Sequence, residues 1–233
     1  MAVAAASTAV LAVGACAPAE SPVVDRFPGP GAVPMDPVYA SPGASTELKA
    51  LVDAQNRRDA RPLFEGLRSG GEEVAARSAF ALASVQERGA EPALAARLDD
   101  PRPPVAAAAA FALGRMGSER AAEALLGALS SSPGVESIGQ VIRSLGLTMG
   151  ESQLERFLAL DRMEGELAEA VMAVARAGVG GQMNGEGLAW LAEHLSHPAE
   201  EVRVAAAYYF SRAPDAGEWR GVAEAVRTAL AAL

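Results

Sequence analysis

Two stretches of the sequence decide the fold: VAARSAFAL at residues 74–82 and VAAAAAFAL at residues 105–113. They agree at seven of nine positions and begin 31 residues apart. In both, apolar residues recur at the three- and four-residue spacing of a helix with a buried face. A fixed period of about thirty residues is typical of stacked repeats, in which each unit buries its apolar surface against its neighbour.

The sequence around these two copies follows the same plan of paired helices. Each copy is followed by a short turn and a second apolar helix, and weaker copies begin near residues 134, 165 and 200. A further helix pair comes before them, starting at Ser45. No run shows the alternating pattern of a strand. We therefore expect an all-α fold of about five to six helix-pair repeats over residues 45–233.

The alanine run within residues 105–113 is interpreted as packing and not as low-complexity filler. A helix that is apolar on nearly every side must be buried on nearly every side. Filler would not place Phe80, Phe111 and Tyr208 at the same position of three repeats. Only 5% of the residues are aromatic, and a composition rich in Ala, Leu, Arg and Glu favours helices. Small side chains at these positions let helices approach closely.

The repeats resemble HEAT-type repeats, in particular the short bacterial kind also seen in phycobilisome-lyase-like proteins. The matching residues are Asp100-Pro101 before Val105, then Ala109-Ala110 and Leu113-Gly114, and a second instance in His197-Pro198 before Val202-Arg203. The resemblance implies a right-handed α-solenoid that holds other proteins. Ala75 and Ala106 replace the arginine that usually follows the valine, and only Arg203 keeps it. Because that arginine commonly ties repeats together, we expect few polar links between repeats.

The first fifteen residues have the character of a secretory signal: they are uncharged, and apolar or small. Val13-Gly14-Ala15-Cys16 resembles the bacterial lipobox, which implies a signal peptide at 1–15 and a diacylglycerol on Cys16. No Lys or Arg precedes the apolar run, so the true start of the chain is open. Two alternatives stay open: cleavage at Ala15-Cys16-Ala17 with plain secretion, or an alanine-rich start without a targeting role.

Residues 16–44 are interpreted as a flexible tether between the lipid and the repeats. Seven of the fifteen prolines lie in residues 17–44, and periodic apolar patterning is absent there. Proline fixes φ and has no N–H to donate, which favours an extended chain over packed structure. The expected organisation is thus a signal peptide at 1–15, a tether at 16–44 and repeats at 45–233.

Charge and cysteine content exclude several classes of protein. The formal net charge is −9, and Lys49 is the single lysine against nineteen arginines. Nucleic-acid binding needs clustered basic residues to contact phosphates, and no basic run is present. With Cys16 as the one cysteine, no disulfide can form within the chain.

No motif of a known catalytic, metal or cofactor site is found in the sequence. His194 and His197 lie three residues apart, a spacing that allows a metal, but no third ligand of suitable type is evident, and capping or solvated histidines are the simpler interpretation. Glutamates cluster at predicted helix starts, where carboxylates meet the positive end of the helix dipole. We expect no catalytic residues, no metal, no cofactor, no small-molecule substrate and no enzyme activity.

A candidate protein-binding patch lies near the end of the array, on what the resemblance implies is the concave face lined by second helices. Tryptophan, tyrosine and arginine are the preferred anchors of protein interfaces. The patch comprises Trp190, Trp219, Arg220, Arg227, Tyr208 and Tyr209. The competing interpretation is that both tryptophans fill core.

These observations favour a non-enzymatic scaffold for protein partners, anchored by lipid in the bacterial envelope. The expected location is the periplasmic side of the outer membrane, with a secreted or periplasmic protein as the alternative. Bacterial lipoproteins with HEAT-like repeats can carry a cyclophilin-type peptidyl-prolyl isomerase domain after them. That resemblance implies a second function, the repeat part of such a folding factor. A bilin-lyase-like role rests on the repeat type alone, and the envelope address argues against it.

Overall fold

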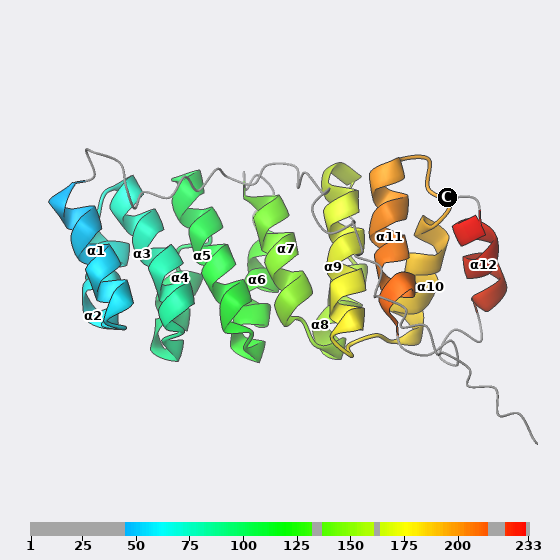
Figure 1. Ribbon diagram of the computed structural model, residues 1–233, viewed down its shortest axis with the longest axis horizontal. Coiled ribbons are helices and arrows are strands. Elements are labelled where there is room, and N and C mark those ends of the chain that lie inside the picture. The colour runs from blue at the N-terminus through cyan, green and yellow to red at the C-terminus, as the bar shows by residue number, and fades with distance from the viewer. Residues whose placement is uncertain (1–44, 132–136, 161–163, 214–221, 232–233) are drawn as a thin grey trace, which may run out of the picture. The chain divides into compact units, whose positions relative to one another are not determined.

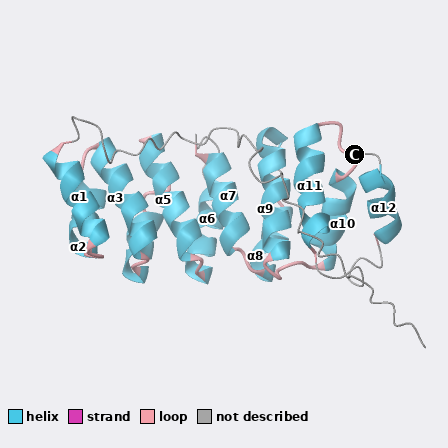
Figure 2. Ribbon diagram, in the orientation of Figure 1, coloured by secondary structure: helices cyan, strands magenta, loops and turns pink. Residues whose placement is uncertain are grey.

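The computed structural model describes residues 45–131, 137–160, 164–213 and 222–231. Over these ranges the chain forms helices joined by turns, without a strand (Figure 2). The expected all-α fold is therefore confirmed. The predicted signal peptide, Cys16 and the tether at 16–44 lie outside the described residues, as do Trp219 and Arg220.

Within the described ranges, the helices form six consecutive pairs, each with a first and a second helix. This number agrees with the expected five to six repeats. The first helices are α1 (Thr46–Asn56), α3 (Glu72–Val85), α5 (Pro103–Met116), α7 (Ile138–Thr148), α9 (Leu167–Val179) and α11 (Glu200–Arg212). The second helices are α2 (Ala60–Ser69), α4 (Glu91–Ala95), α6 (Glu119–Ser131), α8 (Glu151–Leu158), α10 (Gly185–His194) and α12 (Ala223–Ala231). Short 3₁₀ turns, Arg88–Ala90 and Glu164–Glu166, precede α4 and α9.

The array is held together mainly through its first helices. Helix α3 packs on α1 and α5, and the series continues from α5 to α7, from α7 to α9 and from α9 to α11 (Figure 1). Neighbouring second helices contact one another more sparsely. Each first helix between α3 and α9 is thus covered by a first helix on both sides, as expected for a solenoid.

Helix α5 shows how the alanine-rich sequence fits this position. It begins with Pro103 and Pro104, whose missing N–H groups cost nothing in the first turn. It ends at Gly117, which adopts a left-handed φ of 62°. Most of its alanines are buried, whereas Phe111 is half-buried and stacks on Phe80 of α3 with ring centroids 5.2 Å apart. The packing interpretation of the alanine run is confirmed.

Neighbouring first helices approach one another most closely at three glycines spaced 32 residues apart: Gly114, Gly146 and Gly178. A Cβ atom on Gly114 would lie 2.7 Å from the Cβ atom of Ser144. On Gly146 it would lie 2.6 Å from the Cα atom of Ala173, and on Gly178 it would lie 2.8 Å from the ring of Tyr209. At these three positions, in the last turn of each first helix, there is therefore no room for a side chain.

We expect Gly146→Ala to destabilise the fold by about 1–3 kcal/mol, because the added methyl group meets the Ala173 backbone and forces the helices apart. Gly127→Ala in α6 is the matched control, since Gly127 is exposed and its new Cβ would meet no atom within 4 Å. That variant should gain about 0.5–1 kcal/mol from helix propensity alone. Urea unfolding measures the free energy of unfolding of both variants. Equal stabilisation by the two substitutions would contradict the close approach.

Candidate interaction surface and the polar joints behind it

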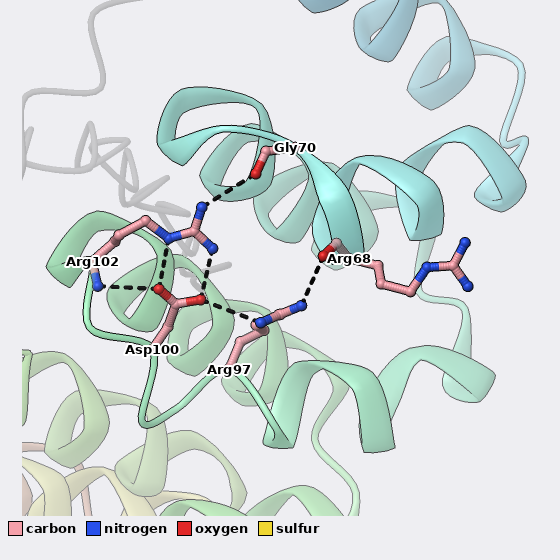
Figure 3. Close-up of polar contacts among 5 residues, drawn as sticks. All are labelled: Arg68, Gly70, Arg97, Asp100 and Arg102. Carbon is pink, nitrogen blue, oxygen red and sulfur yellow. Dashed lines mark hydrogen bonds and ion pairs between the residues drawn. The ribbon is translucent and has the colours of Figure 1, made fainter.

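A buried carboxylate organises the turn between α4 and α5. The side chain of Asp100 is 2% exposed. It accepts hydrogen bonds from Nε and Nη2 of Arg102, at 2.7 and 2.8 Å, and from the backbone N–H of Arg102 at 3.1 Å. Arg97 approaches the other side of the carboxylate, with Nη1 at 3.5 Å (Figure 3). The guanidinium of Arg102 holds the pKa of Asp100 below its usual value.

Both arginines also reach back to the preceding repeat. Arg102 donates from Nη1 to the carbonyl oxygen of Gly70 at 3.2 Å, and Arg97 donates from Nη2 to the carbonyl oxygen of Arg68 at 3.1 Å (Figure 3). These carbonyls belong to the end of α2, where helix carbonyls lack intrahelical partners. Asp100 thus fixes two cations that join one repeat to the one before it.

His197 makes a similar turn at the start of α11. Its Nδ1 accepts a hydrogen bond from the backbone N–H of Ala199 at 3.1 Å, two residues on, as Asp100 does for Arg102. Arg203 donates to the carbonyl oxygens of His197 and Pro198, at 3.0 and 2.8 Å. His197 therefore stabilises the turn that leads into α11, while the N-cap residue Ala199 has no side-chain capping bond.

The other histidine is bonded within its own helix. His194 places Nδ1 2.7 Å from the carbonyl oxygen of Trp190, and its ring centroid lies 4.2 Å from that of Trp190. Among the described residues, no group of three His, Cys, Asp or Glu side chains could hold a metal ion. Both histidines have a structural role at their positions.

The expectation of few polar links between repeats is wrong. Ala75 and Ala106 lack the arginine that usually follows the valine of the repeat. Residues at other positions of the repeats form the polar links instead. Glu123 of α6 accepts from Gln153 and Arg156 of α8, each at 2.8 Å, and these donors lower its pKa. Arg143 of α7 pairs with Glu169 of α9 at 3.6 Å.

The solvent-facing side of the first helices carries arginines and half-buried aromatic rings. The guanidinium of Arg77 lies 5.7 Å from the centroid of Phe80, and that of Arg212 lies 4.7 Å from the centroid of Tyr208. We name this side the first-helix face. Its residues are Arg77, Phe80, Phe111, Arg115, Arg143, Leu147, Arg176, Val179, Tyr208 and Arg212.

Two side chains on this face are unusual because they are large, apolar and exposed. Leu147 is 56% exposed and Val179 is 41% exposed. They occupy equivalent positions in the last turns of α7 and α9, 32 residues apart, each directly after one of the close-contact glycines.

A pocket of about 480 Å³ opens beside Leu147, at the C-terminal ends of α7 and α9. Met149 lies in its wall and is buried, and Gln182 contributes a polar side chain. Two charged residues line it, Arg176 of α9 and Glu119 of α6. The pocket and the two exposed apolar side chains form the strongest candidate for an interaction surface among the described residues.

The structure distributes the predicted binding patch over several environments. Tyr208 is half-buried on the first-helix face, and Trp190 is half-buried on α10. Arg227 is exposed on α12 and pairs with Glu224 at 2.6 Å. Tyr209 is 2% exposed and belongs to the core, where its ring lies against Gly178. The sequence analysis did not identify Leu147 and Val179. Their spacing of 32 residues, which places them at equivalent positions of two repeats, is the signal that could have identified them.

The region from α2 to the last turn of α7 matches a known repeat family. Residues 60–146 match the family model for HEAT repeats. Over this stretch the chain is similar to HEAT repeats. The phycobilisome-lyase-like subtype is not part of that match. No curated protein matches the chain. Among the described helices, none is long and apolar enough to cross a membrane.

We expect Asp100→Asn to destabilise the protein by about 1–3 kcal/mol at pH 7, because Arg97 and Arg102 lose a buried, charged acceptor. The folded-state pKa of Asp100 is depressed. Its stabilising effect is therefore complete above the unfolded-state pKa, about 3.9, and is lost as the pH falls through the lower, folded-state value.

The gap in stability between wild type and Asp100→Asn should thus narrow below about pH 4. Urea unfolding from pH 7 to pH 3 measures it. Asp53→Asn, which changes an exposed carboxylate on α1, is the control and should change stability by less than about 0.5 kcal/mol. A gap that stays constant down to pH 3 would contradict the ionised pair.

Proposed function

We propose that this protein is a non-enzymatic scaffold that binds other proteins and is held in the bacterial envelope by a lipid on Cys16. The observation that carries the proposal is the similarity of residues 60–146 to HEAT repeats. Stacked helical repeats commonly provide an extended surface for protein partners. The first-helix face carries arginines and aromatic rings, the residue types that commonly anchor such interfaces, and it also carries two exposed aliphatic side chains.

The perturbed carboxylates support a structural role for charge in this chain. The pKa values of Asp100 and Glu123 are lowered by hydrogen bonds from arginines that join repeats. The pKa of Glu166 is raised, first by burial and then by the neighbouring Glu169, while Arg143 acts against both. Each shift has a packing or pairing cause next to a helix junction, so none requires a catalytic role.

The envelope location rests on the sequence before the repeats. Val13-Gly14-Ala15-Cys16 has the order of an aliphatic residue, two small residues and a cysteine. The proline-rich residues 16–44 would separate a lipid on Cys16 from the repeats. A single acyl chain binds membranes only marginally, but the two chains of a diacylglycerol suffice for stable anchoring. The repeats would then meet their partners at the membrane surface.

Metabolic labelling with an alkyne-tagged palmitate analogue in a bacterial host tests the anchor. Wild-type protein should carry the label and sediment with the membrane fraction, and Cys16→Ala should do neither. An unlabelled wild type in the soluble periplasmic fraction would refute lipid anchoring and favour plain secretion.

The scaffold role is tested separately by cross-linking in intact cells, followed by mass spectrometry. Wild type should enrich the same small set of proteins in replicate experiments, relative to an unrelated lipoprotein of similar abundance. Absence of any enriched protein would refute the scaffold role, whether or not the label is found on Cys16.

A further inference from the structure

We infer that the first-helix face of α7 and α9, together with the pocket at their C-terminal ends, binds an extended acidic segment of a partner protein. The inference rests on the proposed scaffold function, and it adds the surface and the chemistry of the partner. Its parts are two exposed apolar anchors, their spacing, and a row of arginines.

The anchors are Leu147 and Val179, at 56% and 41% exposure. Every other large aliphatic side chain of the described first helices is buried or half-buried. Single exposed apolar residues are common on protein surfaces, but Leu147 also lines the pocket, and a pocket with apolar walls and a few polar groups is typical of a binding site. Since neither side chain contributes its full area to the core, both are available to a partner.

The spacing of the anchors suits an extended chain. Leu147 and Val179 occupy equivalent positions on two packed helices, and packed helices lie about 8–10 Å apart. Three residues of a segment in the extended polyproline II conformation cover about 9 Å, and its three residues per turn bring side chains three positions apart to the same side. A segment that crosses α7 and α9 can therefore place apolar residues three positions apart on the two anchors.

The charge of this face selects an acidic segment. Arg115, Arg143 and Arg176 come from three successive first helices, in a chain with a net charge of −9. Arg143 already pairs with Glu169. Arg176 lines the pocket, and no carboxylate of the described residues lies within ion-pair distance of it. A carboxylate of the partner would meet Arg176 there.

The distribution of acidic groups orients the segment and disfavours a membrane. Glu119 lies at the α6 side of the pocket, so the partner's carboxylates should face Arg176 instead. Glu73, Glu169 and Glu201 occupy the first turns of α3, α9 and α11 on the same face. A flat anionic membrane would meet these glutamates together with the arginines, whereas a narrow segment across the last turns avoids them.

A fluorescein-labelled peptide in which two leucines flank Glu-Asp tests the inference with the full-length protein. Fluorescence anisotropy measures its Kd. Leu147→Ser and Arg176→Gln should each weaken binding about tenfold or more, the effect of losing one anchor of an interface. Arg88→Gln removes one exposed arginine from the turn before α4 and serves as the matched control. It should bind as wild type does. Circular dichroism verifies that all variants are folded.

A peptide with Gln and Asn in place of Glu and Asp separates charge from apolar contact. It should bind the wild type about tenfold more weakly than the acidic peptide. Equal binding of the two peptides, no binding of the acidic peptide, or equal affinity in all variants would overturn the inference. A vesicle experiment could also overturn the inference. If wild type sediments with phosphatidylglycerol vesicles, and Leu147→Ser and Arg176→Gln abolish this sedimentation, the face binds membranes.

Failure of this inference and failure of the scaffold function give different results. If wild type enriches partners in cells and Leu147→Ser and Arg176→Gln enrich the same partners equally, the scaffold stands and this surface is excluded. If wild type enriches no protein, the scaffold function itself fails. Loss of the enriched proteins in both variants, together with acidic peptide binding by wild type, supports the inference.

Discussion

The structure depends on the close approach of successive first helices at residues without side chains. Gly146 lies so near the Ala173 backbone that a Cβ atom would be 2.6 Å from its Cα atom. Van der Waals attraction and burial both increase with such contact. The alanines of α5 allow the same approach along the rest of the helix. The repeat sequence thus specifies how near the helices come, and helix propensity is secondary.

The close packing of the first helices determines which positions can hold large or charged side chains. Positions 114, 146 and 178 exclude any side chain, and Phe80 and Phe111 stack on the first-helix face. Charged groups are used at the junctions, where Asp100 holds two arginines against helix-end carbonyls. The polar residues therefore stabilise the array.

Much of the fold could be predicted from the sequence, because period and residue size are local properties. The register of residues 105–113 and the turn at His197 follow from the repeat alone. Arg102 could not be identified in this way, since its distant partner is the backbone of Gly70 and leaves no trace in composition. The two tyrosines show the limit for the site: Tyr208 lies on the surface, whereas Tyr209, one residue on and about 100° around the helix, is in the core.

The central claim is that contact between the first helices holds the repeats together. Hydrogen–deuterium exchange with mass spectrometry tests it directly, because amide protection reports the local free energy of opening. Helices α5 and α6 are the best-matched pair for comparing exchange rates, since they belong to one repeat and have 14 and 13 residues. The account predicts slower exchange in α5 than in α6, and in α9 than in α10. Equal or slower exchange in α6 and α10 would contradict it.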